Sequence, residues 1–278
     1  MSKYERINYS EYVGLVGETN RPSGGIKTVQ TVCVNAFIDE NKKVLEIGCN
    51  TGFTSLNITR LTNAQVIGID LVEESLKEAK RRAKSENLNR VNFIKASATD
   101  LTFEDESFDV VWLSNVLSFI EDKSKALGEC LRVLKKNGFL VFVPIYYIKP
   151  IPEEIIHKVG EAIGTNINVR SKNEWIKFIK EFPIPTEIIY NKDYVYENAS
   201  DDIGHYLEEV FEKDDLNILD KEEFEELKQK GKYFMELFNE NLKYAGYSIF
   251  IIQKRQFKEE KELFLTAENE TRKNKTRG

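Results

Sequence analysis

The chain has 278 residues, of which 41% are hydrophobic and 31% are charged, as in soluble proteins with one substantial core. The formal net charge of −6 gives no overall basic field that would attract nucleic acid or an anionic membrane. The three cysteines are far apart and lack metal-ligand spacing, and no apolar run is long enough for a signal segment or a membrane span, so we expect a cytoplasmic protein.

The N-terminal segment is polar and ends in residues that favour turns. Residues 1–24 carry several tyrosines and close with Thr19-Asn20-Arg21-Pro22-Ser23-Gly24. Turn chemistry of this kind predicts a lid rather than part of a core. The next segment, 26–38, has apolar residues at helical spacing, and we expect it to cover a sheet.

Short apolar runs alternate with helical patterns through the middle of the chain. Continuous apolar runs of this length predict strands covered on both faces, as in a parallel sheet flanked by helices. The alternation therefore predicts a doubly wound α/β domain. The expected strands are 44–47, 66–69, 91–94, 110–113 and 139–143, and the expected helices are 53–61, 73–85 and 123–135.

The pattern changes after Pro150, where helices dominate. We expect four domain-level parts: a lid over 1–24, a binding core over 25–150, the end of the sheet over 151–255 with a helical cap inserted at about 197–244, and a charged tail over 256–278. The expected helices are 152–163, 172–182, 202–213 and 221–242, and the expected strands are 187–190, 194–196 and 247–253.

The stretch from Val44 to Gly52 is the strongest functional signal. An apolar strand runs into Glu46, Gly48 and Gly52, and a helix follows. A strand that reverses sharply into a helix needs backbone without Cβ where a ligand approaches, and the first turn of the helix offers free N–H groups. By themselves, two glycines in such a turn leave a packing role equally open.

An acidic residue ends the next strand, and small residues follow the third. Asp70 lies 18 residues after Gly52, a spacing at which a carboxylate can accept hydrogen bonds from both ribose hydroxyls of a nucleoside. Ser97 and Ala98 would let a flat base lie against the backbone, although a plain loop explains them equally well.

The chain resembles the class I S-adenosylmethionine-dependent methyltransferases, in particular the type 11, ubiquinone/menaquinone-biosynthesis-like members. The resemblance covers roughly residues 25–145. It rests on Glu-x-Gly-x-x-x-Gly at 46–52, on Asp70, on Phe108-Asp109-Val110-Val111 and on Glu129-x-x-Arg132-Val133-Leu134-Lys135-Lys136-Asn137-Gly138. It implies a Rossmann-like sheet of seven strands whose last strand is antiparallel, with S-adenosylmethionine across the carboxyl ends of strands one to four and the acceptor over strands four and five.

The resemblance also implies a set of cofactor-binding residues. Glu46, Gly48, Cys49, Asn50 and Gly52 would line the methionine part, Asp70 and Leu71 the ribose and adenine, Ser97 and Ala98 the base, and Ser114, Asn115 and the residues to Leu117 the floor of the methyl-transfer site. The family often has glycine in place of Asn50 and aspartate in place of Ser97; asparagine tolerates left-handed backbone, so the turn survives.

Methyl transfer is an in-line displacement on an activated sulfonium, so the protein mainly aligns two reactants in a dry site. The catalytic candidates are His205, as a general base in the expected cap, and Tyr146, as a pocket residue; surface and packing roles are the alternatives. Arg21 is a candidate to pair with the donor carboxylate, and we expect no metal ion because no cluster of acidic ligands can be assembled.

Several alternatives to a small-molecule methyltransferase can be compared with the sequence. A nicotinamide dehydrogenase needs glycines at G-x-G-x-x-G spacing, which this turn lacks. A base-directed DNA methyltransferase would resemble its relatives in a proline motif after strand four, and Ser114-Asn115-Val116-Leu117 has no proline, so we expect no DNA substrate. A non-catalytic nucleoside-binding module stays open, as do protein and RNA substrates, and the sequence leaves the oligomeric state undetermined.

Overall fold

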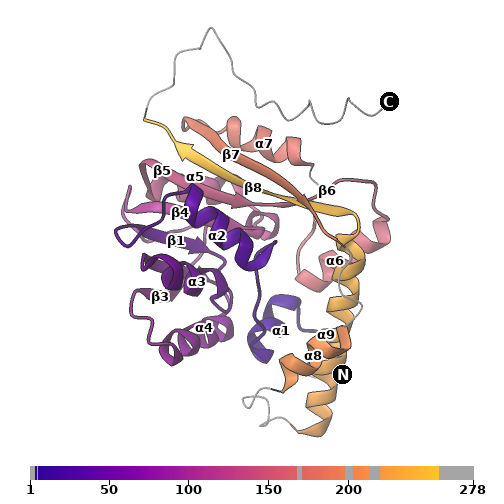
Figure 1. Cartoon of the computed structure of the whole chain (residues 1–278). Coiled ribbons are helices and arrows are strands. Elements are labelled where there is room, and N and C mark those ends of the chain that lie inside the picture. Colours follow the sequence, from indigo (N-terminus) through magenta and orange to yellow (C-terminus); the bar gives the residue numbers. More distant parts are fainter. Residues whose placement is uncertain (1–3, 5, 168–170, 198–202, 213–219, 257–278) are drawn as a thin grey trace, which may run out of the picture.

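The computed structural model describes residues 4, 6–167, 171–197, 203–212 and 220–256. Its centre is one mixed sheet of eight strands (Figure 1). The strands are β1 (Lys43–Ile47), β2 (Gln65–Asp70), β3 (Val91–Lys95), β4 (Phe108–Ser114), β5 (Leu134–Val143), β6 (Ile145–Tyr147), β7 (Thr186–Val195) and β8 (Ala245–Lys254).

The strand order is β3-β2-β1-β4-β5-β8, and β8 also pairs with β6 and β7. The pairs from β3 to β5 are parallel, whereas β8 runs antiparallel to β5, β6 and β7. The expected α/β fold with one antiparallel final strand is confirmed. The expected number of seven strands was wrong in detail, because Pro144, which has no N–H to donate, divides the fifth strand into β5 and β6.

Two differences from the expected elements have simple causes. The strands expected at 187–190 and 194–196 form the single strand β7, since the polar residues between them lie on an exposed edge where polar side chains remain in water. The helix expected at 123–135 ends at Val133, and the chain enters β5 at once.

Helices cover both faces of the sheet. One face packs against α2 (Gly25–Asn35), α3 (Phe53–Thr62) and α4 (Glu73–Ser85), and the other against α5 (Lys123–Val133) and α7 (Lys172–Lys180). Trp112 and Phe108 on β4 are fully buried, because this central strand is covered on both sides. The 3-10 turn η1 (Val116–Phe119) follows β4.

A second group of helices lies beside the sheet (Figure 1). It consists of α1 (Tyr9–Val16), α6 (Glu153–Ile163), α8 (Ile203–Phe211) and α9 (Lys221–Leu242), which we call the helical layer. These helices share their own apolar core, centred on Phe234 and Tyr12. The N-terminal segment was expected to lie outside any core, but α1 buries Tyr12, Val13 and Val16 on one helical face.

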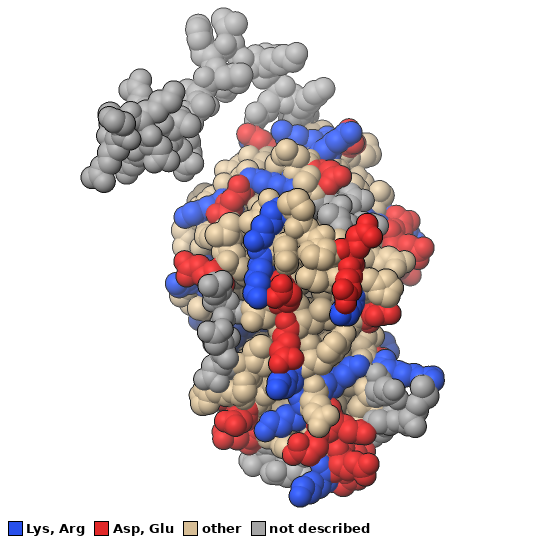
Figure 2. Space-filling view, turned by 90° about the vertical axis from the view of Figure 1, so that its right-hand side faces the viewer, with Lys and Arg blue, Asp and Glu red and all other residues tan. Residues whose placement is uncertain are grey.

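On the face shown in Figure 2, the described acidic and basic side chains are interspersed. No helix in the described part of the chain combines the length and the hydropathy of a membrane span. The expected charged tail, 256–278, falls almost wholly outside the described residues.

Candidate functional site

The turn after β1 is held to the end of β2 by backbone hydrogen bonds. The amides of Gly48 and Cys49 both donate to the carbonyl of Ile69, at 2.8 and 2.9 Å, and the amide of Asn50 donates to Oδ2 of Asp70 at 2.8 Å. Gly48 and Asn50 have φ of 72° and 47°, in the left-handed region that glycine and asparagine tolerate. The turn is therefore preorganised by the chain itself.

Asp70 keeps hydrogen-bonding capacity for a ligand. One carboxylate oxygen accepts from Asn50 and the other from the amide of Val72, at 2.9 Å. A carboxylate offers about four lone-pair positions, so each oxygen can accept one further hydrogen bond. Leu71, which follows, is 64% exposed and presents apolar surface to the same space.

Glu46 is a buried carboxyl group beside the turn. Its Oε2 accepts hydrogen bonds from the amide of Ser55 at 2.9 Å and from the Ser55 hydroxyl at 2.5 Å. Burial raises the pKa of Glu46 to about 7, although the hydrogen bonds from Ser55 and Thr54 oppose the rise. A cationic group placed beside Glu46 would favour its ionised form.

One large cavity opens over the carboxyl ends of the strands, with a volume of about 1590 Å³. Drug-sized ligands occupy pockets of roughly 300–1,000 Å³, so this cavity has room for two small molecules. Most of the residues singled out in the sequence line it: Arg21, Glu46, Gly48, Cys49, Asn50, Asp70, Leu71, Ser97, Ala98, Ser114, Asn115 and Tyr146.

Gly52 is not among the lining residues. A Cβ at Gly52 would lie 2.8 Å from Cζ of Phe93 and 3.0 Å from Cβ of Ala79. Gly52 thus lets β3 and α4 pack closely against the start of α3, which is the packing role that the sequence left open. The contact of Gly52 with the cofactor stays a prediction beside this packing role.

His205 also lies outside the cavity lining. Its side chain is 66% exposed on α8, where Nε2 lies 3.4 Å from a carboxylate oxygen of Glu209 and Nδ1 lies 3.9 Å from Glu208. An exposed imidazole among carboxylates on a helix surface does not face a reactant in the cavity. The expected catalytic role of His205 is therefore withdrawn.

Tyr146 begins a chain of hydrogen bonds that leads out of the cavity. Its hydroxyl lies 2.8 Å from the Ser248 hydroxyl, which donates to Oδ1 of Asp193 at 2.7 Å. Because the single Ser248 proton goes to Asp193, Tyr146 must donate to Ser248. Lys172 donates to both carboxylate oxygens of Asp193, at 2.5 and 2.6 Å.

The pKa values along this chain follow from its surroundings. Burial raises the pKa of the Tyr146 phenol. Partial burial alone would raise the pKa of Asp193, but the hydrogen bonds from Lys172 and Ser248 bring it below its ordinary value. Tyr146 is accordingly neutral and Asp193 ionised at neutral pH.

Apart from Tyr146, the sequence did not single out the aromatic side of the cavity. Tyr194, Tyr196 and Tyr247 line it, with the Tyr194 and Tyr247 rings stacked at 4.9 Å and the Tyr196 hydroxyl 2.6 Å from the Ser23 hydroxyl. Tyr194 and Tyr247 come from strands that pair only in the folded sheet, Tyr196 directly follows β7, and no local motif marks them. The one available signal was the abundance of tyrosine in the chain, 12 residues.

The Glu129–Arg132 ion pair on α5 holds the segment after β3 in place. Glu129 accepts from the amide of Leu101 at 2.9 Å, and Arg132 donates to the carbonyls of Leu101 and Phe103, at 2.7 and 2.8 Å. Hydrogen bonds from Arg132 hold the pKa of Glu129 below its ordinary value. The Glu129 to Gly138 motif therefore supports the wall that carries Ser97 and Ala98.

The end of β4 forms the floor. The amide of Asn115 donates to the carbonyl of Val143 at 2.8 Å, and Asn115 has φ of 53° as the chain enters η1. Within the described residues, no group of three or more His, Cys, Asp or Glu side chains is placed to hold a metal ion.

Comparisons with known proteins agree with this geometry. The family described as "Methyltransferase domain" matches residues 45–142. An uncharacterized protein of Haemophilus influenzae is 30% identical over 61% of this chain and 69% of its own length. The demethylmenaquinone methyltransferase of Clavibacter sepedonicus is 35% identical over 54% of this chain, and the match spans 56% of that enzyme.

The solved structures show a similar fold. The crystal structure of MccD protein superposes with a TM-score of 0.67 over 85% of this chain and 100% of its own, at 24% identity. The fold and the turn define an α/β protein with a nucleoside-type crevice at the carboxyl edge of its sheet. The chain belongs to the class I S-adenosylmethionine-dependent methyltransferases.

Proposed function

We propose that the protein transfers a methyl group from S-adenosylmethionine, bound at the turn after β1, to a small molecule bound on the aromatic side of the same cavity. The observation that carries the proposal is the continuity of the cavity from Glu46, Asn50 and Asp70 to Tyr146 and Tyr247. One continuous space for donor and acceptor is what in-line displacement needs.

The donor side suits the chemistry of S-adenosylmethionine. The cofactor supplies a methyl group on a positively charged sulfonium and also carries an ammonium group. Carboxyl groups of Glu46 and Asp70 face this part of the cavity, and Asp70 retains acceptor positions for two ribose hydroxyls. Leu71 offers apolar surface for the adenine ring.

Arg21 supplies a cation for the donor carboxylate. Its guanidinium lies 5.7 Å from the centroid of the Phe53 ring, at the start of α3, and lines the cavity. There it adds to the positive end of the α3 dipole. Loss of donor affinity in Arg21→Ala tests this assignment, and unchanged affinity would remove it.

The covered shape of the acceptor side favours a small acceptor. Residues of α6 and α9, among them Val159, Phe238 and Leu242, line the cavity opposite the sheet. A folded protein or an RNA helix would have to displace these helices to present its target group. The similarity to a demethylmenaquinone methyltransferase supports a small-molecule acceptor.

Tyr146, Ser248 and Asp193 provide a way out for a proton. An acceptor hydroxyl becomes strongly acidic as its oxygen takes the methyl group. Its proton passes to Tyr146 while the Tyr146 proton moves to Ser248 and the Ser248 proton to Asp193, whose side chain is 56% exposed to water. The path implies an acceptor atom that carries a proton.

Incubation with methyl-labelled S-adenosylmethionine and a metabolite extract, followed by mass spectrometry, tests the function. We expect a labelled small molecule that has gained one methyl group. Tight binding of S-adenosylhomocysteine without any labelled product would favour a non-catalytic binding module. Label that appears only in protein or RNA would favour a macromolecular acceptor.

A further inference from the structure

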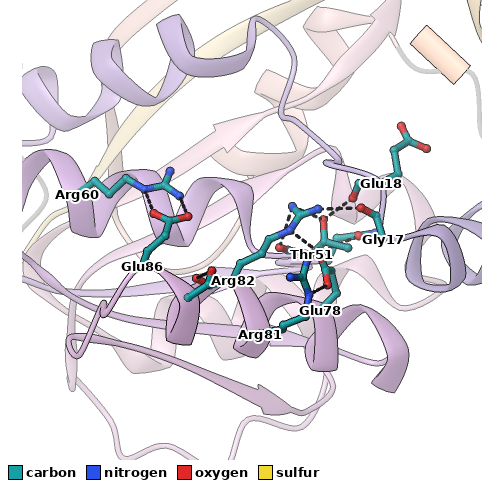
Figure 3. Close-up of polar contacts among 10 residues, drawn as sticks. Gly17, Glu18, Thr51, Arg60, Glu78, Arg81, Arg82 and Glu86 are labelled. Atoms are coloured by element: carbon teal, nitrogen blue, oxygen red, sulfur yellow. Dashed lines mark hydrogen bonds and ion pairs between the residues drawn. The ribbon is translucent and has the colours of Figure 1, made fainter. Parts of the chain in front are cut away.

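Two segments that are far apart in the sequence meet at the side chain of Arg82 on α4 (Figure 3). Its Nη2 donates to the carbonyl of Gly17 at 2.8 Å, and its Nη1 lies 3.4 Å from the carbonyl and 3.3 Å from the hydroxyl of Thr51. Gly17 follows α1, and Thr51 lies in the donor-binding turn. One guanidinium therefore joins the N-terminal segment to that turn.

The position of Arg82 is fixed from its other side. Its Nε donates to Oε1 of Glu78 at 2.6 Å, and the Arg82 side chain is only 15% exposed. Burial tends to raise the pKa of Glu78, but hydrogen bonds from Arg81 and Arg82 hold it below its ordinary value. A fixed, charged guanidinium in a shielded place forms stronger hydrogen bonds than an exposed one.

The bond to Gly17 satisfies a helix end. Gly17 caps α1 with φ of 58° and ψ of 38°, and carbonyls at the C-terminus of a helix have no partner within the helix. A cation there is also favoured by the helix dipole. Arg82 thus determines where α1 ends relative to the donor site.

A second bond runs in parallel and extends the connection to the helical layer. The Thr51 hydroxyl donates to the carbonyl of Glu18 at 2.7 Å. The Glu18 carboxylate accepts from the hydroxyls of Tyr9 on α1 and Tyr206 on α8, at 3.1 and 2.7 Å. The residues that follow, Asn20 to Gly25, form the rim of the cavity.

We propose that Arg82 is a positioning residue which, with Thr51, fastens the segment Gly17–Gly25 over the donor site and so couples donor binding to the placement of the helical layer. The inference rests on the proposed function, since it concerns the same donor site. We take the conformation in which Arg82 and Thr51 hold this segment in place as the one that binds the donor. When these bonds are lost, only a fraction of the molecules keeps that conformation, and the apparent affinity for the donor falls in proportion to that fraction.

The test compares three variants by calorimetric binding of S-adenosylhomocysteine. Arg82→Ala removes the bonds of the guanidinium to Gly17 and Thr51 and leaves the Thr51–Glu18 bond. Thr51→Val removes the bond to Glu18 while it keeps the shape of the side chain. Arg81→Ala is the matched control, because Arg81 pairs with the same Glu78 carboxylate and is 54% exposed on the same helix (Figure 3).

We expect the dissociation constant to rise about tenfold in Arg82→Ala, by a smaller factor in Thr51→Val, and by less than about twofold in Arg81→Ala. Limited trypsin digestion gives a local readout at the end of this segment: S-adenosylhomocysteine should protect the bond between Lys27 and Thr28 in the parent and in Arg81→Ala but not in Arg82→Ala. A purely structural role would lower the melting temperature without changing this protection.

Equal affinities and equal protection in Arg82→Ala and Arg81→Ala would overturn the coupling while donor binding stands. A parent protein that does not bind S-adenosylhomocysteine would instead overturn the proposed function. The two failures are therefore distinguishable in one experiment.

Discussion

The two sides of the cavity are built in different ways. The donor side is made largely of backbone: the amides of Gly48, Cys49 and Asn50 are tied to Ile69 and Asp70, within two adjacent strands. The acceptor side is made of side chains from α6, α9, β6, β7 and β8. Backbone geometry changes little on substitution, whereas side chains can be exchanged singly, so the same donor site can serve different acceptors.

The largest expected effect lies on the acceptor side. Phe234 is fully buried between Tyr9, Tyr12 and Phe238 in the core of the helical layer. Phe234→Ala should destabilise this layer by about 4 kcal/mol, because it leaves a cavity and removes four ring contacts. The sheet has its own core and should remain folded.

Urea unfolding followed by two probes measures this difference. The two tryptophans, Trp112 and Trp175, lie on β4 and α7, so fluorescence reports the sheet, whereas circular dichroism also reports the helical layer. In Phe234→Ala we expect the midpoint of the circular dichroism transition to lie at a lower urea concentration than the midpoint of the fluorescence transition. Gln229→Ala, at an exposed position of the same helix, is the control. Coincident transitions would show that both regions unfold as one unit.

On the donor side, Glu46 should make stability depend on pH. Below about pH 4.5 the carboxyl is protonated in both states; between 4.5 and about 7 the unfolded chain loses the proton while the folded protein keeps it. The Glu46 contribution therefore lowers stability by about 3 kcal/mol as pH rises through this range and stays constant above it.

Glu46→Gln should remove that part of the pH dependence. The free energy of unfolding, measured at about pH 5 and about pH 8, should fall less with pH in the variant than in the parent. Exposed Glu40→Gln is the control and should keep the slope of the parent. Parallel slopes for Glu46→Gln and the parent would show that Glu46 is ionised throughout.

The proton path gives the next effect in size. Tyr146→Phe should lower kcat about a hundredfold, or about 2.7 kcal/mol, with little change in the KM of the acceptor once it is identified. Ser248→Ala and Asp193→Asn should act in the same direction, because each interrupts the chain. Tyr190→Phe on β7 is the control, and an undiminished kcat in Asp193→Asn would refute the path.

The smallest effect separates backbone strain from packing on the donor side. Gly52 and Gly25 have φ of 87° and 56°, but only at Gly52 would a Cβ meet neighbours, whereas at Gly25 nothing lies within 4 Å. Gly52→Ala should therefore destabilise the protein by about 2 kcal/mol more than Gly25→Ala, as measured by urea unfolding. If both variants lose the same stability, glycine is needed at position 52 only for its backbone conformation and not for close packing.

The sequence by itself determined the sheet and the donor side. Apolar runs and the Glu46 to Gly52 turn depend on local spacing, so the α/β fold followed from the chain, whereas the antiparallel final strand was implied only by the family resemblance. Asp70 could be placed beside the turn because parallel strands end at one edge. The assignment of these residues to the cofactor remains a prediction.

Only the tertiary structure decided the rest. It placed His205 on an exposed helix surface and gave Gly52 a packing role, since neither burial nor close approach is written in a local motif. It also joined Tyr146 to Ser248, 102 residues apart, and Ser248 to Asp193, 55 residues apart, in one hydrogen-bonded chain. In the same way it brought Arg82 to Gly17, 65 residues apart. Such contacts depend on how strands and helices pack, and pairing of distant segments leaves no periodic signal in the chain.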